Sequence, residues 1–329
     1  MTFWQQSSVL GQNVREEEVL KEIFDTAQKA VVKIEAVDPH GRLEGTGFFI
    51  NPSGLILTSY SVGGDTGALR VTIADHSFRM PAKRLIADSR SGLALLQIEA
   101  ETPFLSLSED ALPLLDEPVV AVGYPLGGDI SSQTGTIAGS NVRSTEKQFA
   151  TSHLRARVPA LPGLSGSPLL DQRGRVVGVV ISRLEDGAGC YALPARALRK
   201  VHDDYRLYGE VRHGWVGVEL SAQSPAPDAT PQPIIQKLVE SGAAERAGLQ
   251  QGDVLLQIGE FPILAPTDIV DASFFLRAGE DVLIRVKREG QVHEMNVEVG
   301  FHPGVPRPAL VSPPPMFPGH TSFELEQAQ

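Results

Sequence analysis

The feature that most constrains the fold of this chain is a series of short strand-like runs separated by glycine-containing turns. The runs lie at Val31–Val37, Gly45–Ile50, Leu55–Thr58, Leu69–Ile73, Leu93–Ile98 and Pro118–Gly123. The 32 glycines and 24 prolines suit many short strands and turns better than a helical bundle. Helical patterns do not alternate with these runs, which argues against a parallel α/β sheet. The series therefore predicts an all-β barrel or sandwich.

The charge and the polar residues of the chain exclude several classes of partner. The 29 basic and 40 acidic side chains give a net charge of −11, which argues against nucleic acid or an anionic membrane as the main partner. No apolar run reaches the length of about 18 residues that a membrane span needs. Cys190 is the single cysteine, and no histidines have paired-ligand spacing, so we expect no disulfide, metal or cofactor.

The length of 329 residues indicates two domains between flexible ends. We predict a flexible segment over 1–15, a first domain over 16–208, a second over 211–300 and a disordered, proline-rich tail over 301–329. Phe3 and Trp4 are either oligomer contacts or incidental residues of the mobile segment. The first residues lack the basic start and apolar middle of a signal peptide. The chain as written is therefore cytoplasmic, or periplasmic if a leader has been removed.

A helix opens the first domain and a serine turn carries its chemistry. Glu16–Glu18 begin the helix, and Val19, Ile23 and Ala27 recur on its inner face. Much later, Ser165 stands between Gly163 and Gly166, whose flexible backbone lets nearby amides point at one spot. This is the layout of a serine nucleophile with an oxyanion hole made by the amides of Gly163, Leu164 and Ser165. A glycine turn with a purely structural role is the alternative.

Several motifs stand in the same order as those of one protease family. They are Gly45–Phe48, Val122–Gly127, Thr134–Ala138, the Gly163–Pro168 serine turn and Tyr191–Pro194. Together, over about residues 20–205, they resemble the trypsin-like protease domain of the HtrA (Deg) family. The resemblance implies a double β-barrel with a Ser–His–Asp triad.

Two members of that triad are missing. The family carries its general base in Leu-Thr-Asn-x-His-Val-Val, and Leu57–Val62 places Ser61 at the histidine position. The family's acid begins Asp-Leu-Ala-Val-Leu, and here Gly92 holds that position. A serine hydroxyl needs an adjacent base, and neither residue can serve. Loss of triad members costs on the order of a millionfold in turnover.

Another base is the alternative that the sequence leaves open. His40, His76, His153 and His202 lie in this domain, and each is expected to be a surface or rim histidine. His40 or His153, or a residue from a neighbouring subunit, would be the substitute.

A second family pattern begins after a helix and linker over Arg196–Tyr208. The segment Ala244–Leu255 resembles the fingerprint of the PDZ domain in HtrA proteins. We predict that Thr267 caps a helix there and that Glu289–Gly290 turns the closing hairpin. PDZ domains add a C-terminal peptide as a strand to a sheet edge. The resemblance assigns the carboxylate loop, the pairing strand and the helix face to Gly214, Trp215, Val216, Gly217, Val218, Leu220, Ile269, Ser273 and Leu276. Core or interdomain packing of Trp215 and Val218 is the alternative.

We therefore predict a mainly β fold, a trypsin-like double β-barrel followed by an α+β PDZ domain. The expected function is that of an inactive HtrA-like homologue that binds peptides or protein C-termini as a scaffold, a chaperone-like binder or a regulatory partner. The expected assemblies are a homotrimer or a mixed oligomer with an active relative. The alternative function is an active serine endopeptidase that uses Ser165 with a non-standard base.

Overall fold

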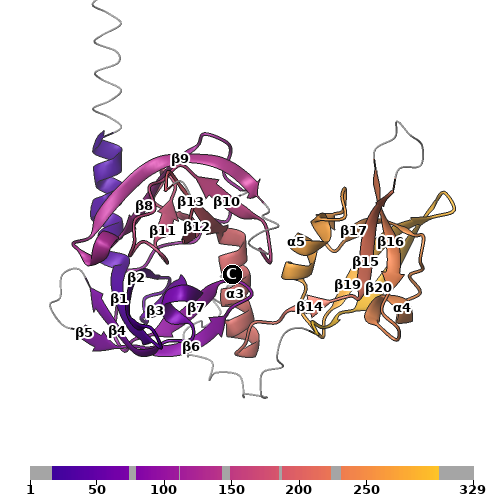
Figure 1. Ribbon diagram of the computed structural model, residues 1–329, viewed down its shortest axis with the longest axis horizontal. Helices are drawn as coiled ribbons and strands as arrows, with labels where there is room; N and C mark the ends of the chain where they lie inside the picture. The colour runs from indigo at the N-terminus through magenta and orange to yellow at the C-terminus, as the bar shows by residue number, and fades with distance from the viewer. Residues whose placement is uncertain are drawn as a thin grey trace, which may run out of the picture.

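The protein is described by a computed structural model that covers residues 17–73, 79–110, 112–142, 149–184, 187–223 and 231–303. Figure 1 shows two bodies side by side, with helix α3 (Ala195–Tyr208) between them. We call them the barrel domain, within residues 17–208, and the C-terminal domain, within 214–303. The interpretations of segment 1–15, Phe3, Trp4 and His76, and of the tail beyond residue 303, lie outside the described residues.

The first half of the barrel domain is a seven-stranded antiparallel sheet. Its strands are β1 (Val31–Asp38), β2 (Gly41–Phe49), β3 (Leu55–Ser59), β4 (Gly67–Ile73), β5 (Arg79–Pro81), β6 (Lys83–Asp88) and β7 (Leu93–Gln97). They follow the order β5-β4-β1-β2-β3-β7-β6. Alternation buries Val32, Ile34 and Ala36 of β1 against Phe49 and Ile56 in one apolar core.

The second half is a closed six-stranded barrel. Its strands are β8 (Pro118–Gly123), β9 (Ser131–Val142), β10 (His153–Ala156), β11 (Pro168–Leu170), β12 (Val176–Arg183) and β13 (Cys190–Pro194). The order is β10-β13-β12-β11-β8-β9, and pairing of β9 with β10 closes it. Three short helical turns, η1 (Gln28–Ala30), α2 (Tyr60–Gly63) and η2 (Pro125–Gly127), complete the domain.

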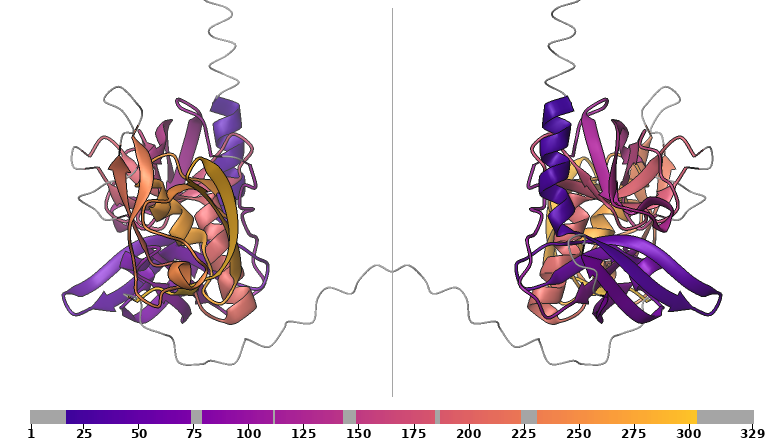
Figure 2. Two further views of the ribbon diagram at one scale, coloured as in Figure 1. Left: turned by 90° about the vertical axis from the view of Figure 1, so that its right-hand side faces the viewer. Right: turned by 90° about the vertical axis from the view of Figure 1, so that its left-hand side faces the viewer.

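The helix at the start of the described chain spans residues 17–27. Ile23 and Ala27 are buried as predicted, but Val19 is 37% exposed, so the inner stripe is not covered in its first turn. This helix lies on the side of the barrels opposite the C-terminal domain (Figures 1 and 2).

The C-terminal domain is a sheet with two helices. Its elements are β14 (Gly214–Trp215), β15 (Val218–Gln223), β16 (Gln232–Leu238), α4 (Ala243–Arg246), β17 (Val254–Ile258), β18 (Phe261–Pro262), α5 (Asp268–Phe275), β19 (Asp281–Arg288), β20 (Gln291–Glu298) and β21 (Gly300–Phe301). The main strand order is β15-β16-β17-β19-β20, so β15 stands at an edge. Glu289 and Gly290 turn the predicted hairpin with positive φ angles of 51° and 84°.

Two details of this domain differ from expectation. Thr267 precedes α5 but makes no capping hydrogen bond through its side chain, because its own backbone is already helical. Instead, Asp268 Oδ2 accepts hydrogen bonds from the amides of Leu264 and Ala265. Phe301, expected in the disordered tail, pairs with Gly214 in β21.

Buried polar contacts dock the two domains. Asp271 on α5 accepts hydrogen bonds from the Thr151 hydroxyl at 2.7 Å and from the Ser152 amide and hydroxyl at 2.5 Å each. Phe274 on α5 is fully buried in the same apolar cluster as Leu198 and other barrel-domain residues. The interface is therefore a packed core with specific hydrogen bonds, which holds the two domains in one arrangement.

A buried carboxylate on α3 adds to this interface. Asp204 is 0% exposed and pairs with Lys200 Nζ and Arg277 Nε, each at 2.6 Å. Its Oδ2 also accepts a hydrogen bond from the Arg212 amide at 2.9 Å. Arg277 belongs to the C-terminal domain, so the Asp204 carboxylate is paired with one cation from each domain.

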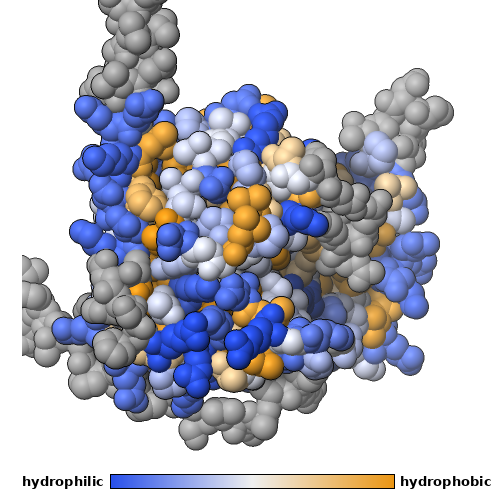
Figure 3. Space-filling view, turned by 60° about the vertical axis from the view of Figure 1, so that its left-hand side comes forward, coloured by the Kyte–Doolittle hydropathy of each residue, from blue (hydrophilic) through white to orange (hydrophobic). Residues whose placement is uncertain are grey.

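The surface in Figure 3 is mixed, with hydrophobic residues in small groups among hydrophilic ones. Within the part of the chain that the structure describes, no helix is both long and apolar enough to cross a membrane.

Candidate functional site

Ser165 lies where the two halves of the barrel domain meet. The turn between residues 163 and 167 leads into β11, and the Thr46 amide of β2 donates to the Ser165 carbonyl at 3.0 Å. Thr46 Oγ1 also donates to the Gly163 carbonyl at 2.8 Å. The first sheet therefore supports the serine turn directly.

The two glycines of this turn are required by close backbone contacts. Gly163 has φ +92°, and a Cβ atom there would lie 2.2 Å from the Tyr124 carbonyl oxygen. Gly166 has φ +87°, and its Cβ atom would lie 2.1 Å from the Thr46 carbonyl oxygen. Any side chain at either position would both clash and strain the backbone.

The hydroxyl of Ser165 sits in a cluster of three serines. Ser59 Oγ lies 2.8 Å from Ser165 Oγ, Ser61 Oγ lies 3.0 Å from it, and Ser59 and Ser61 are 3.0 Å apart. Ser165 also donates to the Ile181 carbonyl at 3.4 Å. Ser61 was expected beside Ser165, whereas Ser59 was missed, and only its place at the end of β3 hinted at it. Among the described residues these are the hydrogen-bond partners of the Ser165 hydroxyl, and all are neutral oxygens.

The backbone amides of the serine turn differ in their hydrogen bonding. The Leu164 amide donates to the Leu161 carbonyl at 3.1 Å, so it is used inside the turn. The amides of Gly163 and Ser165 donate to no described residue. Of the three amides that the sequence assigned to an oxyanion hole, two thus have no acceptor in the part of the chain that the structure describes. A cavity of about 300 Å³ beside them is lined by Leu161, Pro162, Val180, Ile181 and the turn itself.

Gly92 lies near this cluster. Its carbonyl accepts a hydrogen bond from the Tyr60 amide at 2.7 Å, and its φ is +76°. A Cβ atom at Gly92 would meet Ile181 Cγ2 at 3.7 Å, an ordinary contact. The position next to the serine cluster therefore has room for a side chain.

The candidate substitute bases are engaged elsewhere or exposed. His153 is buried, donates a hydrogen bond from Nδ1 to the Thr151 carbonyl at 2.8 Å, and stacks on Phe149. Burial lowers the pKa of His153 to about 4, against the opposing effects of Thr151 and Asp271. His40 is exposed in the turn after β1, and burial lowers the pKa of His202 on α3. Within the described ranges, no cluster of three or more His, Cys, Asp or Glu side chains has the arrangement of a metal site.

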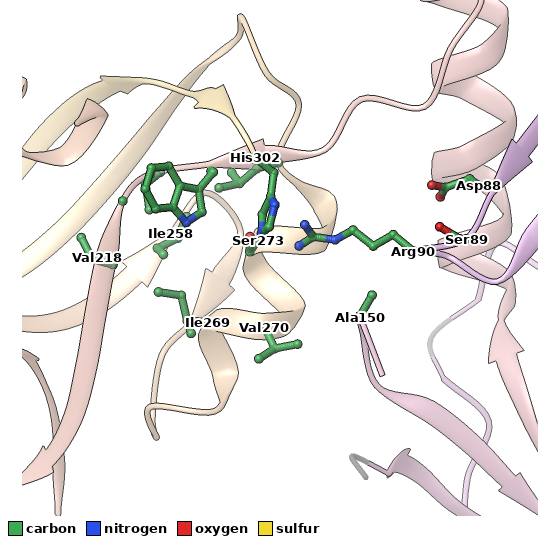
Figure 4. Close-up of a pocket in the computed structure, with 14 residues that line it drawn as sticks. Asp88, Ser89, Arg90, Ala150, Val218, Ile258, Ile269, Val270, Ser273 and His302 are labelled. Carbon is green, nitrogen blue, oxygen red and sulfur yellow. The ribbon is translucent and has the colours of Figure 1, made fainter. Parts of the chain in front are cut away.

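A larger cavity of about 520 Å³, which we call the interdomain groove, lies between the two domains (Figure 4). The C-terminal domain lines it with Trp215–Val218, Ile258, Ile269, Val270, Ser273, Leu276 and His302. The barrel domain lines it with Asp88, Ser89, Arg90 and Ala150. It therefore runs between the start of edge strand β15 and helix α5, facing the barrel domain.

Seven of the nine residues assigned to peptide binding line this groove, and two do not. Gly214 is buried in β14, where a Cβ atom would lie 2.5 Å from Val299 Cγ1. Leu220 packs against the core of its own domain. The barrel-domain residues of the groove were missed, because the sequence does not reveal how the two domains dock.

The edge of the groove has both a carboxylate and hydrogen-bond donors. Asp88 accepts hydrogen bonds from His213 Nε2 at 2.9 Å and from the Ser91 amide at 3.0 Å. Burial raises the pKa of Asp88, but these bonds outweigh it and hold the pKa below its ordinary value. The amides of Val216 and Gly217 donate to no described residue, and Gly217 has φ +82°. Successive free amides at such a turn can bind an anion.

Comparison with known proteins matches both domains to families. The profile of the trypsin-like peptidase domain matches residues 45–179, and the profile of the PDZ domain matches residues 214–299. The fold class predicted from the sequence is thereby confirmed.

Curated relatives are about 30% identical to the chain over the aligned positions. One is a "probable periplasmic serine endoprotease DegP-like" of Ectopseudomonas mendocina (strain ymp), 30% identical over 270 residues, covering 79% of this chain and 56% of the relative. Another, of Rhizobium meliloti (strain 1021), carries the same description and is 28% identical over 276 residues, covering 80% and 54%. The chain thus spans about half the length of the curated relatives it matches.

Solved structures share the fold. The HtrA-type protease AlgW with a tripeptide superposes with a TM-score of 0.73 at 23% identity, covering 85% of this chain and 96% of that one. A serine endoprotease from Yersinia pestis superposes with a TM-score of 0.65 at 21% identity, covering 86% and 97%. The chain is therefore similar to HtrA-type serine endoproteases, and its segments match a trypsin-like peptidase domain followed by a PDZ domain.

Proposed function

We propose that this protein is a proteolytically inactive HtrA-like homologue that binds peptides or protein C-termini in the interdomain groove. One observation carries the loss of activity: the described hydrogen-bond partners of Ser165 Oγ are the Ser59 and Ser61 hydroxyls and the Ile181 carbonyl. A hydroxyl cannot take the proton of another hydroxyl near neutral pH, so Ser165 stays a weak nucleophile.

The groove supports the binding role. Edge strand β15 leaves one side open for an added peptide strand, and the free amides of Val216 and Gly217 stand where that strand would end. Ile269 and Leu276 from the α5 side would contact the ligand's apolar side chains. The match to a PDZ domain agrees with this use.

Further parts of the proposal rest on the relatives. Curated relatives are described as periplasmic, and we propose the same compartment for this protein. We also propose that it works as a scaffold, a chaperone-like binder or a regulatory partner, as a homotrimer or in mixed oligomers with an active relative. The domain limits we propose are 16–208 for the first domain and 211–300 for the second, with the second extended to include Phe301 of β21.

An active serine endopeptidase is the second candidate function. It is favoured by the unbonded amides of Gly163 and Ser165 and by the adjacent cavity, which together retain the form of an oxyanion hole with a substrate subsite. It would need a base from outside the described partners of Ser165.

Reaction with a fluorophosphonate probe distinguishes the inactive homologue from an active serine endopeptidase. We expect the protein and its Ser165→Ala variant to label equally weakly. Strong labelling that Ser165→Ala abolishes would establish an activated hydroxyl and reject the inactive assignment.

Peptide capture tests the binding role. The probe is a library of decapeptides with free C-terminal carboxylates and four randomised final positions. Ile269→Arg, which puts a charge into the groove, should abolish capture, whereas Val292→Arg, at a 60% exposed position on β20, should not. Equal capture by both variants would place binding outside the groove.

A further inference from the structure

The interdomain groove contains one guanidinium that the C-terminal domain does not supply. Arg90 comes from the loop between β6 and β7 of the barrel domain and lines the groove. Figure 4 shows its side chain extended across the gap, with the guanidinium directed toward Ser273 and His302 of the C-terminal domain.

Arg90 is held in place by its loop. Asp88 accepts from the Ser91 amide, and the Gly92 amide donates to the Asp88 carbonyl at 3.0 Å, so the turn is closed on both sides of Arg90. The Asp88 carboxylate in turn accepts a hydrogen bond from His213, the residue just before β14 of the C-terminal domain. The contact of Asp271 with Thr151 and Ser152 docks α5 against the same side. The position of Arg90 relative to the groove is therefore set by both domains.

The guanidinium of Arg90 has no hydrogen bond or ion pair with a described residue, although it is half-buried. Burial lowers the pKa of Arg90, and only the nearby charge of Asp88 opposes this. Asp88 is the one acid among the residues that line the groove, and its carboxylate is directed to His213 and Ser91. A half-buried guanidinium without a partner is stabilised most by a carboxylate, which it binds through two parallel hydrogen bonds.

The surroundings of Arg90 also favour an anion. The pKa of His302 is lowered by burial and then by the nearby basic groups of Arg90 and His213, so these three side chains lie close to one another. The free amides of Val216 and Gly217 line the same groove. The Arg90 guanidinium and these amides therefore offer hydrogen-bond donors to an anion in the same groove.

We infer that Arg90 of the barrel domain binds a carboxylate of the peptide held by the PDZ domain, so that the peptidase-like domain supplies part of the PDZ specificity. The carboxylate is either the peptide's terminal one or an acidic side chain near its end. The inference rests on the proposed peptide binding, and it adds a residue that a PDZ domain alone does not contain.

The test compares four forms of the full chain: wild type, Arg90→Gln, Arg90→Lys and Arg173→Gln. Arg173 is exposed in the turn between β11 and β12, so its substitution removes the same charge away from the groove. The best free-acid decapeptide from the library is used as the probe, and equal urea unfolding curves establish that the variants are folded. We expect Arg90→Gln to weaken binding roughly 10- to 100-fold, Arg90→Lys to weaken it less, and Arg173→Gln to leave it unchanged.

Two further peptides identify the carboxylate. If the terminal group is bound, the effect of Arg90→Gln disappears with the C-terminally amidated peptide. If a side chain is bound, the effect disappears when Glu or Asp in the peptide is replaced by Gln or Asn. Either result supports the inference. Equal affinity of wild type and Arg90→Gln for all three peptides would overturn it and leave the proposed function intact, whereas no capture by the wild type would overturn both.

Discussion

The serine cluster and the interdomain groove differ in their titratable groups: the Ser165 hydroxyl has only neutral described partners, whereas acidic and basic side chains surround the groove. Around Ser165 the framework of a nucleophile turn is retained, with two obligatory glycines and unbonded amides, but the hydroxyl's partners are neutral oxygens. Around the groove, Asp88, Arg90, His213 and His302 gather within one docked interface. Backbone geometry alone can hold a carbonyl or a carboxylate, whereas proton transfer needs a titratable group. Under the proposed function, the groove keeps the groups that recognition needs, and the serine cluster lacks the group that proton transfer needs.

The largest expected effect comes from supplying the missing charges. The double substitution Ser61→His and Gly92→Asp puts an imidazole beside Ser165 and a carboxylate behind it. Asp tolerates the positive φ of Gly92 better than most residues. Its Cβ atom would lie 3.7 Å from Ile181 Cγ2, an ordinary contact distance. We expect fluorophosphonate labelling of Ser165 to rise at least ~100-fold, since general base catalysis contributes that much. Unchanged labelling would show that the turn itself is defective, and adding Ser165→Ala gives the background.

The framework of the serine turn is tested by Gly166→Ala. The new Cβ atom would lie 2.1 Å from the Thr46 carbonyl oxygen at φ +87°. We expect the free energy of unfolding in urea to fall by about 3 kcal/mol. The matched control is Gly174→Ala, at φ +73° with no atom within 4 Å, which should cost only about 1 kcal/mol. Equal losses would mean that the turn can relax away from Thr46.

Substitution of His153 tests whether this histidine has a structural role or acts as the general base for Ser165. Its pKa of about 4 lies below the ordinary 6.5, so the unfolded chain binds a proton first as the pH falls. The stabilisation is complete above pH 6.5 and is lost toward pH 4. Between pH 7 and pH 5 we expect the free energy of unfolding to fall by roughly 2 kcal/mol more in wild type than in His153→Gln. Fluorophosphonate labelling should be the same in both, and a loss of labelling in the variant would make His153 the base.

The docking that shapes the groove is tested by Asp271→Asn. Asn keeps an oxygen for the Ser152 amide, but its NH2 group replaces Oδ2, so the Ser152 hydroxyl must turn and accept, and the bonds lose the assistance of the carboxylate charge. We expect a loss of roughly 1.5 kcal/mol in urea unfolding and faster proteolysis of the linker between the domains. Asp281→Asn, at the exposed start of β19, should change neither. Proteolysis at the wild-type rate would show that the apolar packing around Phe274 holds the domains without Asp271.

Local patterns in the sequence predicted much of the fold. The strand β1 and the hairpin at Glu289–Gly290 follow from alternation and from residues that accept a positive φ, and these signals act over a few residues. The position of Ser61 beside Ser165 followed from motifs in a familiar order. Thr267 failed as a cap because its own backbone is helical, which its residue type does not reveal.

The remaining parts of both sites depend on contacts between distant segments. Ser59 reaches Ser165 only because β3 ends at the serine turn, 106 residues away in the chain. Arg90 enters the groove only because α5 docks on the barrel domain, and Gly214 is kept out of it by Val299 and Leu276. No periodicity or turn signal in one segment carries that information.

The carboxylate of Asp204 also makes the two domains thermodynamically cooperative. One domain cannot open without leaving this fully buried charge short of a partner, either the Arg277 guanidinium or the Arg212 amide. Asp204 would keep Lys200 as a partner, but losing one hydrogen bond to a buried carboxylate still costs about 1.5–3 kcal/mol, a large share of the stability of a small domain. We therefore expect the two domains to unfold in a single thermal transition. The linker then joins two parts of one cooperative folding unit and does not act as a hinge.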